Sequence, residues 1–233
     1  MKTTSILIMA LAAGTLAAQD EPRLDARFQL FAELAWPAQI VVAQPNASTN
    51  INDQPGRQTG IGFRFLGEIA PAPGFYYELG GMFDASSHFT YSGTLPGGAT
   101  LDMTDAKLTN SYFSLGAAWM PKFGDNVTLG LHLEARGEYL RVQGGVNSSS
   151  LGGTVQQDQS VTYLVPWARG SFDYTFGDPG KNLRPFLGVE GGWAILRTSQ
   201  TRVPDFTNGN LDNRTVESLA PHYSGAVYAG LRF

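Results

Sequence analysis

His222 and Ser224 stand two residues apart near the end of the 233-residue chain, a pair that could do hydrolytic chemistry. In serine hydrolases a histidine takes the proton of the serine nucleophile, and a carboxylate orients the histidine. No Asp or Glu follows Ser224 in this sequence. The other histidines, His88 and His132, are scattered and Cys is absent, so neither a transition-metal site nor a cofactor is expected.

Charged residues form a second chemical pattern, because many of them are two or four positions apart. Glu134, Arg136 and Glu138 are the clearest case, and they alternate with apolar residues such as Leu133 and Ala135. Successive side chains of a β-strand point to opposite faces, so this spacing places three charges on one face and an apolar row on the other.

Eight windows of the sequence alternate in this way, at residues 28–36, 61–69, 75–83, 112–119, 127–139, 164–176, 187–195 and 223–233. They predict eight strands, each about as long as the ~9–11 residues that a tilted strand needs to cross a bilayer. The charges on the faces opposite the apolar rows are Glu33, Arg64, Glu68, Glu78, Glu134, Arg136, Glu138, Arg169, Asp173, Glu190 and Arg232.

Aromatic residues mark both ends of the apolar rows. One end carries Phe28, Phe75, Trp119, Phe176 and Phe233, and the other carries Trp36, Phe83, Phe113, Tyr139, Trp193 and Tyr223. The two interfaces of a bilayer select such girdles, whereas a soluble core has no reason to sort its aromatics by height. The apolar rows are therefore expected to face lipid. Since strands in lipid must close, we predict an all-β fold: a closed, antiparallel, eight-stranded transmembrane up-and-down β-barrel.

The links between the windows alternate in length. Short links rich in Pro, Gly, Asp and Asn are expected at 70–74, 121–126 and 177–183, and long polar loops at 37–58, 84–108, 141–160 and 197–220. This alternation places the long loops at one end of the barrel and both termini at the other, as in barrels with short periplasmic turns and long extracellular loops.

The beginning of the chain has the composition of a secretory leader. Lys2 precedes an apolar stretch from Ile6 to Leu16 and a small-residue exit at Ala17 and Ala18, which predicts a signal peptide over 1–18 and a barrel over 19–233. The sequence contains no Cys, which fits a protein of the oxidising cell envelope. The net charge of -4 and the lack of a basic block make nucleic acid an unexpected partner.

The strand count, the loop asymmetry and the last segment together resemble the eight-stranded outer-membrane proteins of the OmpA-barrel, OmpX and OmpW type. In that segment apolar residues stand at alternate positions before a terminal aromatic: Tyr223, Val227, Ala229, Leu231 and Phe233. It is similar to the signal that the barrel-assembly machinery reads in that group. The resemblance implies a bacterial outer-membrane location with periplasmic termini, lipid and the assembly machinery as partners, and a monomer.

Two kinds of function remain open on the sequence. The interior charges, four basic and seven acidic, can form an Arg–Glu network that fills the lumen, or they can line a narrow cation-preferring water path. The first function is therefore a non-enzymatic structural or channel barrel. The second is a surface-interaction barrel that binds an extracellular ligand through its long loops, as adhesins do.

Catalysis is the third alternative. His222-Tyr-Ser224 is similar to the His-x-Ser segment of the outer-membrane lipid A deacylases, in which the serine acts at the barrel surface. If Phe233 faces lipid, the same parity turns His222 and Ser224 into the lumen, where a lipid ester does not reach. The missing acid after Ser224 is a second departure, so no enzymatic activity is expected.

Overall fold

The fold was analysed in a computed structural model, which describes residues 24–37, 49–53, 57–94, 100–148, 152–196, 206–207, 210–211 and 213–233. The expected leader over residues 1–18 lies outside this range. Among the described residues, no helix is long and apolar enough to cross a membrane.

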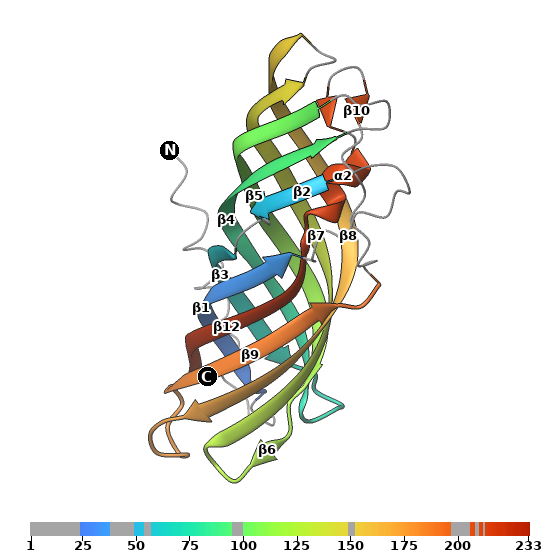
Figure 1. The fold of residues 1–233 in the computed structure, drawn as a ribbon. Coiled ribbons are helices and arrows are strands. Elements are labelled where there is room, and N and C mark those ends of the chain that lie inside the picture. The colour runs from blue at the N-terminus through green and yellow to red at the C-terminus, as the bar shows by residue number, and fades with distance from the viewer. Residues whose placement is uncertain are drawn as a thin grey trace, which may run out of the picture.

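Eight long strands form the wall of a barrel (Figure 1). They are β1 (Ala26–Pro37), β3 (Gln58–Glu68), β4 (Phe75–Thr94), β5 (Thr100–Trp119), β7 (Val127–Ser148), β8 (Gly153–Thr175), β9 (Arg184–Ala194) and β12 (Pro221–Arg232). Each pairs antiparallel with the next, and β12 returns to β1 with Phe28 opposite Leu231 and Trp36 opposite Tyr223. The sheet is therefore closed, which confirms the predicted eight-stranded antiparallel up-and-down barrel.

Five short elements complete the described chain. The strand β2 (Thr49–Asp53) pairs with β4, β6 (Lys122–Phe123) pairs with β7, and β10 (Phe206–Thr207) pairs with β11 (Asn210–Leu211). The helix α2 (Asn213–Ser218) leads into β12.

The three short links lie at one end of the barrel, which we call the turn end; the opposite end is the loop end. Each short link contains a glycine with a positive φ, at Gly74 (82°), Gly124 (69°) and Gly177 (89°), a backbone conformation that other residues rarely adopt. Phe233 also lies at the turn end, where its amide donates to the carbonyl of Ala26 at 2.8 Å. The last residue is thus tied to the first strand.

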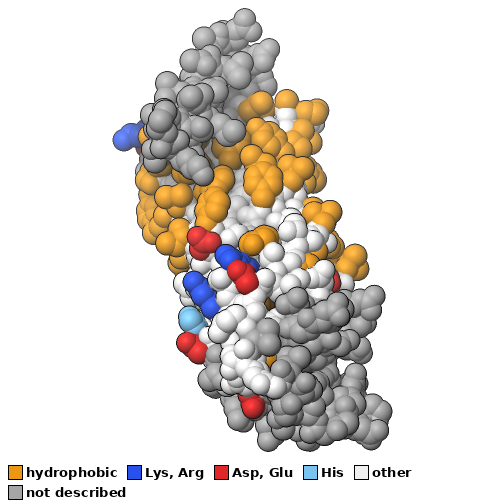
Figure 2. Space-filling view, turned by 90° about the horizontal axis from the view of Figure 1, so that it is seen from above, with side chains coloured by type: hydrophobic (Ala, Val, Ile, Leu, Met, Phe, Trp, Pro, Cys, Tyr) orange, Lys and Arg blue, Asp and Glu red, His pale blue; other side chains and the backbone are white. Residues whose placement is uncertain are grey.

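The two faces of the wall have opposite polarity, as β7 illustrates. Leu131 and Leu133 are 61% and 63% exposed on the outside, whereas Glu134 and Arg136 are buried inside. A soluble barrel has the reverse arrangement. Figure 2 shows hydrophobic side chains over one part of the outer surface, and uncharged polar and charged side chains beyond them.

The predicted long loops over 84–108 and 141–160 are wrong in large part. There β4 continues as a paired strand up to Thr94, and β5 already begins at Thr100. In the same way β7 continues up to Ser148, and β8 already begins at Gly153.

Along β7 and β8 the polarity of the faces exchanges while the parity is kept. In β4 and β5, register shifts next to Asp84 (φ 50°) and Asp105 (φ 53°) also move the inward row by one residue. Past Tyr139, the outward residues of β7 become polar and the inward ones apolar. A search for outward apolar rows ends where that exchange begins.

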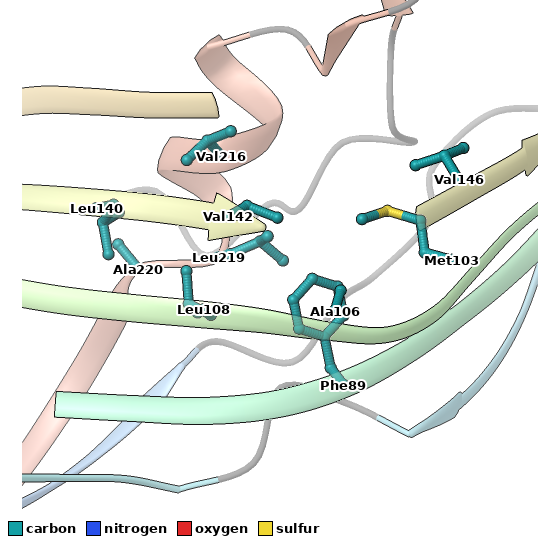
Figure 3. Packing of buried hydrophobic residues seen from close by; sticks show 10 residues of the cluster. All are labelled: Phe89, Met103, Ala106, Leu108, Leu140, Val142, Val146, Val216, Leu219 and Ala220. Carbon is teal, nitrogen blue, oxygen red and sulfur yellow. The ribbon is translucent and has the colours of Figure 1, made fainter. Parts of the chain in front are cut away.

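The inward apolar residues of this extension form a cluster that we call the apolar cap. It consists of Phe89, Met103, Ala106, Leu108, Leu140, Val142 and Val146 from the strands, with Val216, Leu219 and Ala220 from α2 and the residues after it. Figure 3 shows Val216 and Leu219 beside Val142. The helix therefore covers the inside of the extended wall at the loop end.

Inward-facing glycines make room for large side chains on neighbouring strands. Gly62 of β3 lies opposite Phe31 of β1, and a Cβ added at Gly62 would overlap both the Phe31 ring and the Gly81 carbonyl oxygen. Gly170 of β8 instead faces outward, and a Cβ there would meet nothing within 4 Å.

We expect Gly62→Ala to lower the free energy of unfolding by about 1–3 kcal/mol, the usual cost of forcing an extra methyl group into a packed interior. Gly170→Ala is the matched control and should leave it nearly unchanged. Urea unfolding of the protein refolded into detergent micelles or liposomes measures both. Equal effects of the two substitutions would contradict the packing described for the interior.

Candidate functional site in the barrel interior

The middle of the barrel interior is filled by a group of charged side chains that we call the central network. Its members are Glu33, Arg64, Glu78, His132, Glu134, Arg136, Glu138, Arg169 and Glu190, all of them buried. They come from six of the eight strands, because each strand turns every second side chain inward.

Arg169 of β8 is the most connected member. Its guanidinium contacts Glu78 of β4, lies 3.0 Å from Glu134 Oε1 of β7, and lies 2.5 Å from Glu190 Oε2 of β9. One cation therefore joins carboxylates from three strands. Gly192, opposite Arg169 on β9, leaves room for the stem, since a Cβ there would lie 2.5 Å from Arg169 Cγ.

Arg64 forms the second junction. Its Nη1 and Nη2 donate to the two oxygens of Glu190 at 2.7 and 3.1 Å, and its Nε lies 2.7 Å from Glu78 Oε1. The guanidinium also lies 4.8 Å from the centre of the Phe31 ring. The bidentate pair with Glu190 is the strong geometry for an arginine and a carboxylate.

Arg136 is held by rings as well as by charge. Its guanidinium carbon lies 4.1 Å from the ring centres of both Tyr112 and Trp167. Its Nε donates to Glu134 at 2.6 Å, and its Nη1 lies 3.5 Å from Glu33. Stacking between two rings fixes the plane of the guanidinium in a way that a lysine could not reproduce.

Hydroxyl and indole groups satisfy the remaining carboxylate oxygens. The Tyr112 hydroxyl donates to Glu33 at 2.9 Å, and the Trp167 indole and the Tyr163 hydroxyl donate to the two oxygens of Glu138 at 2.8 and 2.6 Å. These donors let acidic side chains outnumber arginines without leaving bare carboxylate oxygens, which matters because a buried charge is costly unless it is hydrogen-bonded.

His132 is a member of this network through both ring nitrogens. Its Nδ1 lies 2.7 Å from Glu78 Oε2, and its Nε2 lies 2.8 Å from the hydroxyl oxygen of Ser171. Two polar contacts on a 4% exposed ring leave it no free position toward a substrate.

A second group of charges, which we call the turn-end cluster, lies at the turn end of the barrel. It is centred on Asp25, whose carboxylate lies 2.9 Å from Arg232, 3.1 Å from Lys122 and 3.7 Å from Arg27, and accepts from the Tyr76 hydroxyl at 2.7 Å. Burial disfavours the ionised carboxyl, but the nearby cations outweigh burial, so the pKa of Asp25 is lowered.

The eleven charges that the sequence placed on the inner face occupy two levels. Nine are buried in the lumen. Eight of these belong to the central network, and Asp173 lies on its turn-end side, 3.0 Å from Arg27. The other two lie at the turn end and are partly exposed. There Glu68 accepts from the amides of Asp25 and Gly74, and Arg232 binds Asp25.

Four charged residues of the interior and the turn end lie outside the predicted windows: Asp25, Arg27, Lys122 and Arg184. Asp25 and Arg27 precede the first window, although the parity of that window, extended by one residue, would have included Arg27 on the inner face. Arg184 begins β9 and donates to the carbonyls of Asp125 and Gly177, so it links two short turns. No charge spacing in the sequence indicates that last role.

The residues of the two predicted girdles lie on the outside of the wall. Phe28, Phe75, Phe83, Phe113, Trp119, Tyr139, Phe176 and Trp193 are exposed, and Trp36 is half-buried. Tyr223, Val227, Ala229, Leu231 and Phe233 of the closing segment are also exposed. His222 and Ser224 are instead buried inside the barrel, 7% and 6% exposed. Among the described residues no cluster of His, Asp and Glu could hold a metal ion.

Comparisons with known proteins give likenesses of architecture only. No family model matches the chain, and no curated protein sequence matches it. Among solved structures, Ail of Yersinia pestis, determined with the heparin analogue sucrose octasulfate, is 9% identical with a TM-score of 0.42, over 91% of this chain and 100% of that one. OprG of Pseudomonas aeruginosa is 10% identical with a TM-score of 0.42, over 91% and 97%.

Neisserial surface protein A is 14% identical with a TM-score of 0.37, over 90% of this chain and 95% of that one. The architecture of this chain is established by its own strand pairing. That pairing makes the chain a small, closed, eight-stranded β-barrel, the architecture that the resemblance to the OmpA-barrel, OmpX and OmpW group predicted.

Proposed function

We propose that the protein is an integral barrel of the bacterial outer membrane that acts as a closed structural scaffold, without enzymatic activity and without an open pore. The observation that carries this proposal is the interior. Nine buried charged or titratable side chains of the central network are joined by ion pairs and hydrogen bonds across six strands.

The outer surface supports the membrane location. Large apolar side chains are exposed around the wall on the turn-end side of the extension, with Ile61 70%, Leu164 74% and Val227 61% exposed. Soluble proteins rarely expose a continuous apolar surface of this kind. A closed barrel also pairs its backbone groups between strands, which is the condition for crossing lipid with strands.

The orientation follows from the lengths of the links. Short turns at the end that holds the terminal Phe233 favour a periplasmic turn end, so that the extended wall of β4, β5, β7 and β8 stands outside the cell. The exposed alternate residues before Phe233 favour recognition by the barrel-assembly machinery. No described contact requires a second copy of the chain, and a monomer embedded in lipid is the simplest arrangement.

Two features of the interior favour a closed lumen over a cation path. An eight-stranded barrel is only wide enough for its own side chains. The central network occupies the middle, and the apolar cap follows at the loop end, where water and ions would have to cross an apolar layer. The acidic excess, which suggested a cation path, is compensated by hydroxyl and indole donors such as Tyr112, Tyr163 and Trp167.

Surface interaction is the second candidate function. It is favoured by the rigid extension, in which four strands continue past the apolar part of the wall and keep an apolar core against α2. Such a platform can hold binding loops in place. Lipid hydrolysis finds no support, because His222 and Ser224 are buried inside the wall and away from lipid.

Labelling of single cysteines in intact cells tests location and orientation together, since the chain has no cysteine of its own. A membrane-impermeant maleimide should label Gln156→Cys, on the exposed extension of β8, without treatment of the cells. Lys181→Cys, in the β8–β9 turn, should be labelled only after the outer membrane is permeabilised. Labelling of Lys181→Cys alone in intact cells would reverse the orientation, and recovery of the protein in a soluble fraction without detergent would exclude the membrane.

Planar-bilayer recording tests the closed lumen. We expect no reproducible single-channel conductance from the folded wild-type protein, because paired charges and the apolar cap fill the lumen. The Arg141→Met variant, which alters an exposed ion pair outside the lumen, should be equally silent. If the wild-type protein shows a steady conductance, and Glu134→Ala or Arg136→Ala changes it, the lumen is a channel and the proposal of a closed lumen is wrong.

Removing the central cation tests the energetic role of the network. Arg169→Met keeps much of the side-chain volume but leaves Glu78, Glu134 and Glu190 without their shared guanidinium, so the free energy of unfolding should fall by about 3–5 kcal/mol. Arg141→Met breaks the exposed pair with Asp158 and should have little effect. Both are measured by urea unfolding in liposomes. If Arg169→Met is as stable as the wild type, the central network does not stabilise the fold as proposed.

A further inference from the structure

The seam of the barrel, where β1 pairs with β12, carries two like charges at its turn end. Arg27 of β1 stands directly opposite Arg232 of β12, and Ala26 and Phe233 follow as the last pair of the seam. Cations directly opposite each other on paired strands repel and weaken the pairing. The first and last strands therefore need an anion at this point if the seam is to stay closed.

Asp25 is placed to supply that anion. One of its carboxylate oxygens lies 2.9 Å from Arg232 Nε, and the other lies 3.7 Å from Arg27 Nη2. Arg27 has a second acidic partner in Asp173, 3.0 Å away. Within the part of the chain that the structure describes, Asp25 is the only acid that forms an ion pair with Arg232. A single carboxylate thus bridges the two strands that close the barrel.

The same residue ties the seam to the neighbouring turns. The Tyr76 hydroxyl, at the start of β4, donates to the Asp25 carboxylate at 2.7 Å, and Lys122 Nζ of β6 lies 3.1 Å from it. The Asp25 amide donates to Glu68 Oε2 at 3.0 Å, and the Asp25 carbonyl accepts from the Glu68 amide at 2.8 Å. The Asp25 side chain is 4% exposed, so little water competes with these partners.

These contacts join distant parts of the chain. Arg232 follows Asp25 by 207 residues and belongs to the last strand, so their bond forms only when β12 meets β1. Closing so long a loop is entropically costly, and contacts of this kind form late in folding. Interactions that are absent from the folding transition state act mainly on the rate of unfolding. Asp25 is therefore in a position to control how fast the closed barrel opens.

We propose that Asp25 is a latch that holds the seam closed. It neutralises the opposed arginines of β1 and β12 and anchors both strands to the turns beside them, and its release precedes the separation of the two strands. The latch lies at the turn end, outside the central network. It depends neither on whether the lumen conducts nor on what the extended wall contacts.

Rates of unfolding and refolding in liposomes test the latch. Asp25→Asn keeps the shape of the side chain but removes its charge, so unfolding in urea should become about tenfold faster, while refolding stays within about twofold of the wild type. Asp158→Asn makes the same change in the exposed ion pair with Arg141 and should alter neither rate. A heat-modifiability gel, in which the folded barrel migrates anomalously until boiled, measures the folded fraction at each time. An unchanged unfolding rate of Asp25→Asn overturns the proposal.

A disulfide across the seam separates a latch from a general stabilising contact. Phe28 and Leu231 stand opposite each other, and the chain has no cysteine of its own, so Phe28→Cys with Leu231→Cys gives one cross-link. The Cα atoms of a hydrogen-bonded antiparallel pair lie about 5.5 Å apart, which a disulfide spans. In the oxidised protein Asp25→Asn should no longer speed unfolding, and reduction should restore its effect. Arg169→Met, in the central network, should keep its effect in both states. An effect of Asp25→Asn that persists in the cross-linked protein overturns the latch.

Tyr76→Phe keeps the proposal testable if Asp25→Asn does not fold. This substitution removes one donor to the Asp25 carboxylate and leaves every charge of the turn-end cluster in place. Unfolding should become faster by a smaller factor than in Asp25→Asn, and the cross-link should again abolish the difference. If Tyr76→Phe speeds unfolding equally with and without the cross-link, the contacts of Asp25 do not act through the seam and the proposal is wrong.

Discussion

A charge that points into an eight-stranded barrel must find a counter-charge or hydrogen-bonding partners inside that barrel, and much of this structure depends on that constraint. The lumen is too narrow for bulk water, so the charges of the inner face remain only if they are paired. Arg169 meets the requirement by joining carboxylates of β4, β7 and β9. Inward glycines such as Gly192 then become necessary, because the arginine stems need the space.

The same requirement explains why the wall changes character along its length. Along β7, which runs without a register shift against β8, inward Glu138 is followed by inward Leu140, while outward Tyr139 is followed by outward Arg141. In the proposed membrane, lipid around the part of the wall nearer the turn end favours the apolar row outward and leaves the polar row to pair inside. Beyond the lipid, water takes the polar row and the apolar row forms a core, as in a soluble sheet. The strand β7 thus keeps a single alternation of inward and outward residues along its length, while the environment of its outer face changes.

Parity, strand number and barrel closure could be predicted from the sequence because they depend on local alternation and on the requirement that strands in lipid close. The partners of the charges could not, because they depend on the stagger of the strands. Arg64 and Glu190 are 126 residues apart and meet only through that stagger. The extended strands were taken for loops because the apolar row crosses from one face to the other past Tyr139. That exchange is itself visible in Leu140, Val142 and Val146, which follow the inner parity.

The division of the interior has a consequence for where recognition can occur. The carboxylates of the central network are held by arginines, by His132 and by hydroxyl and indole donors, so the acidic side chains of the network are already engaged with other groups of the barrel. The apolar cap uses the inner face of the extension to hold α2. What is left for contact with other molecules is the outer, polar face of β4, β5, β7 and β8 beyond the apolar wall, where groups such as Arg141 and Asp158 are exposed. A barrel stabilised from within in this way can vary that outer face without loss of its fold.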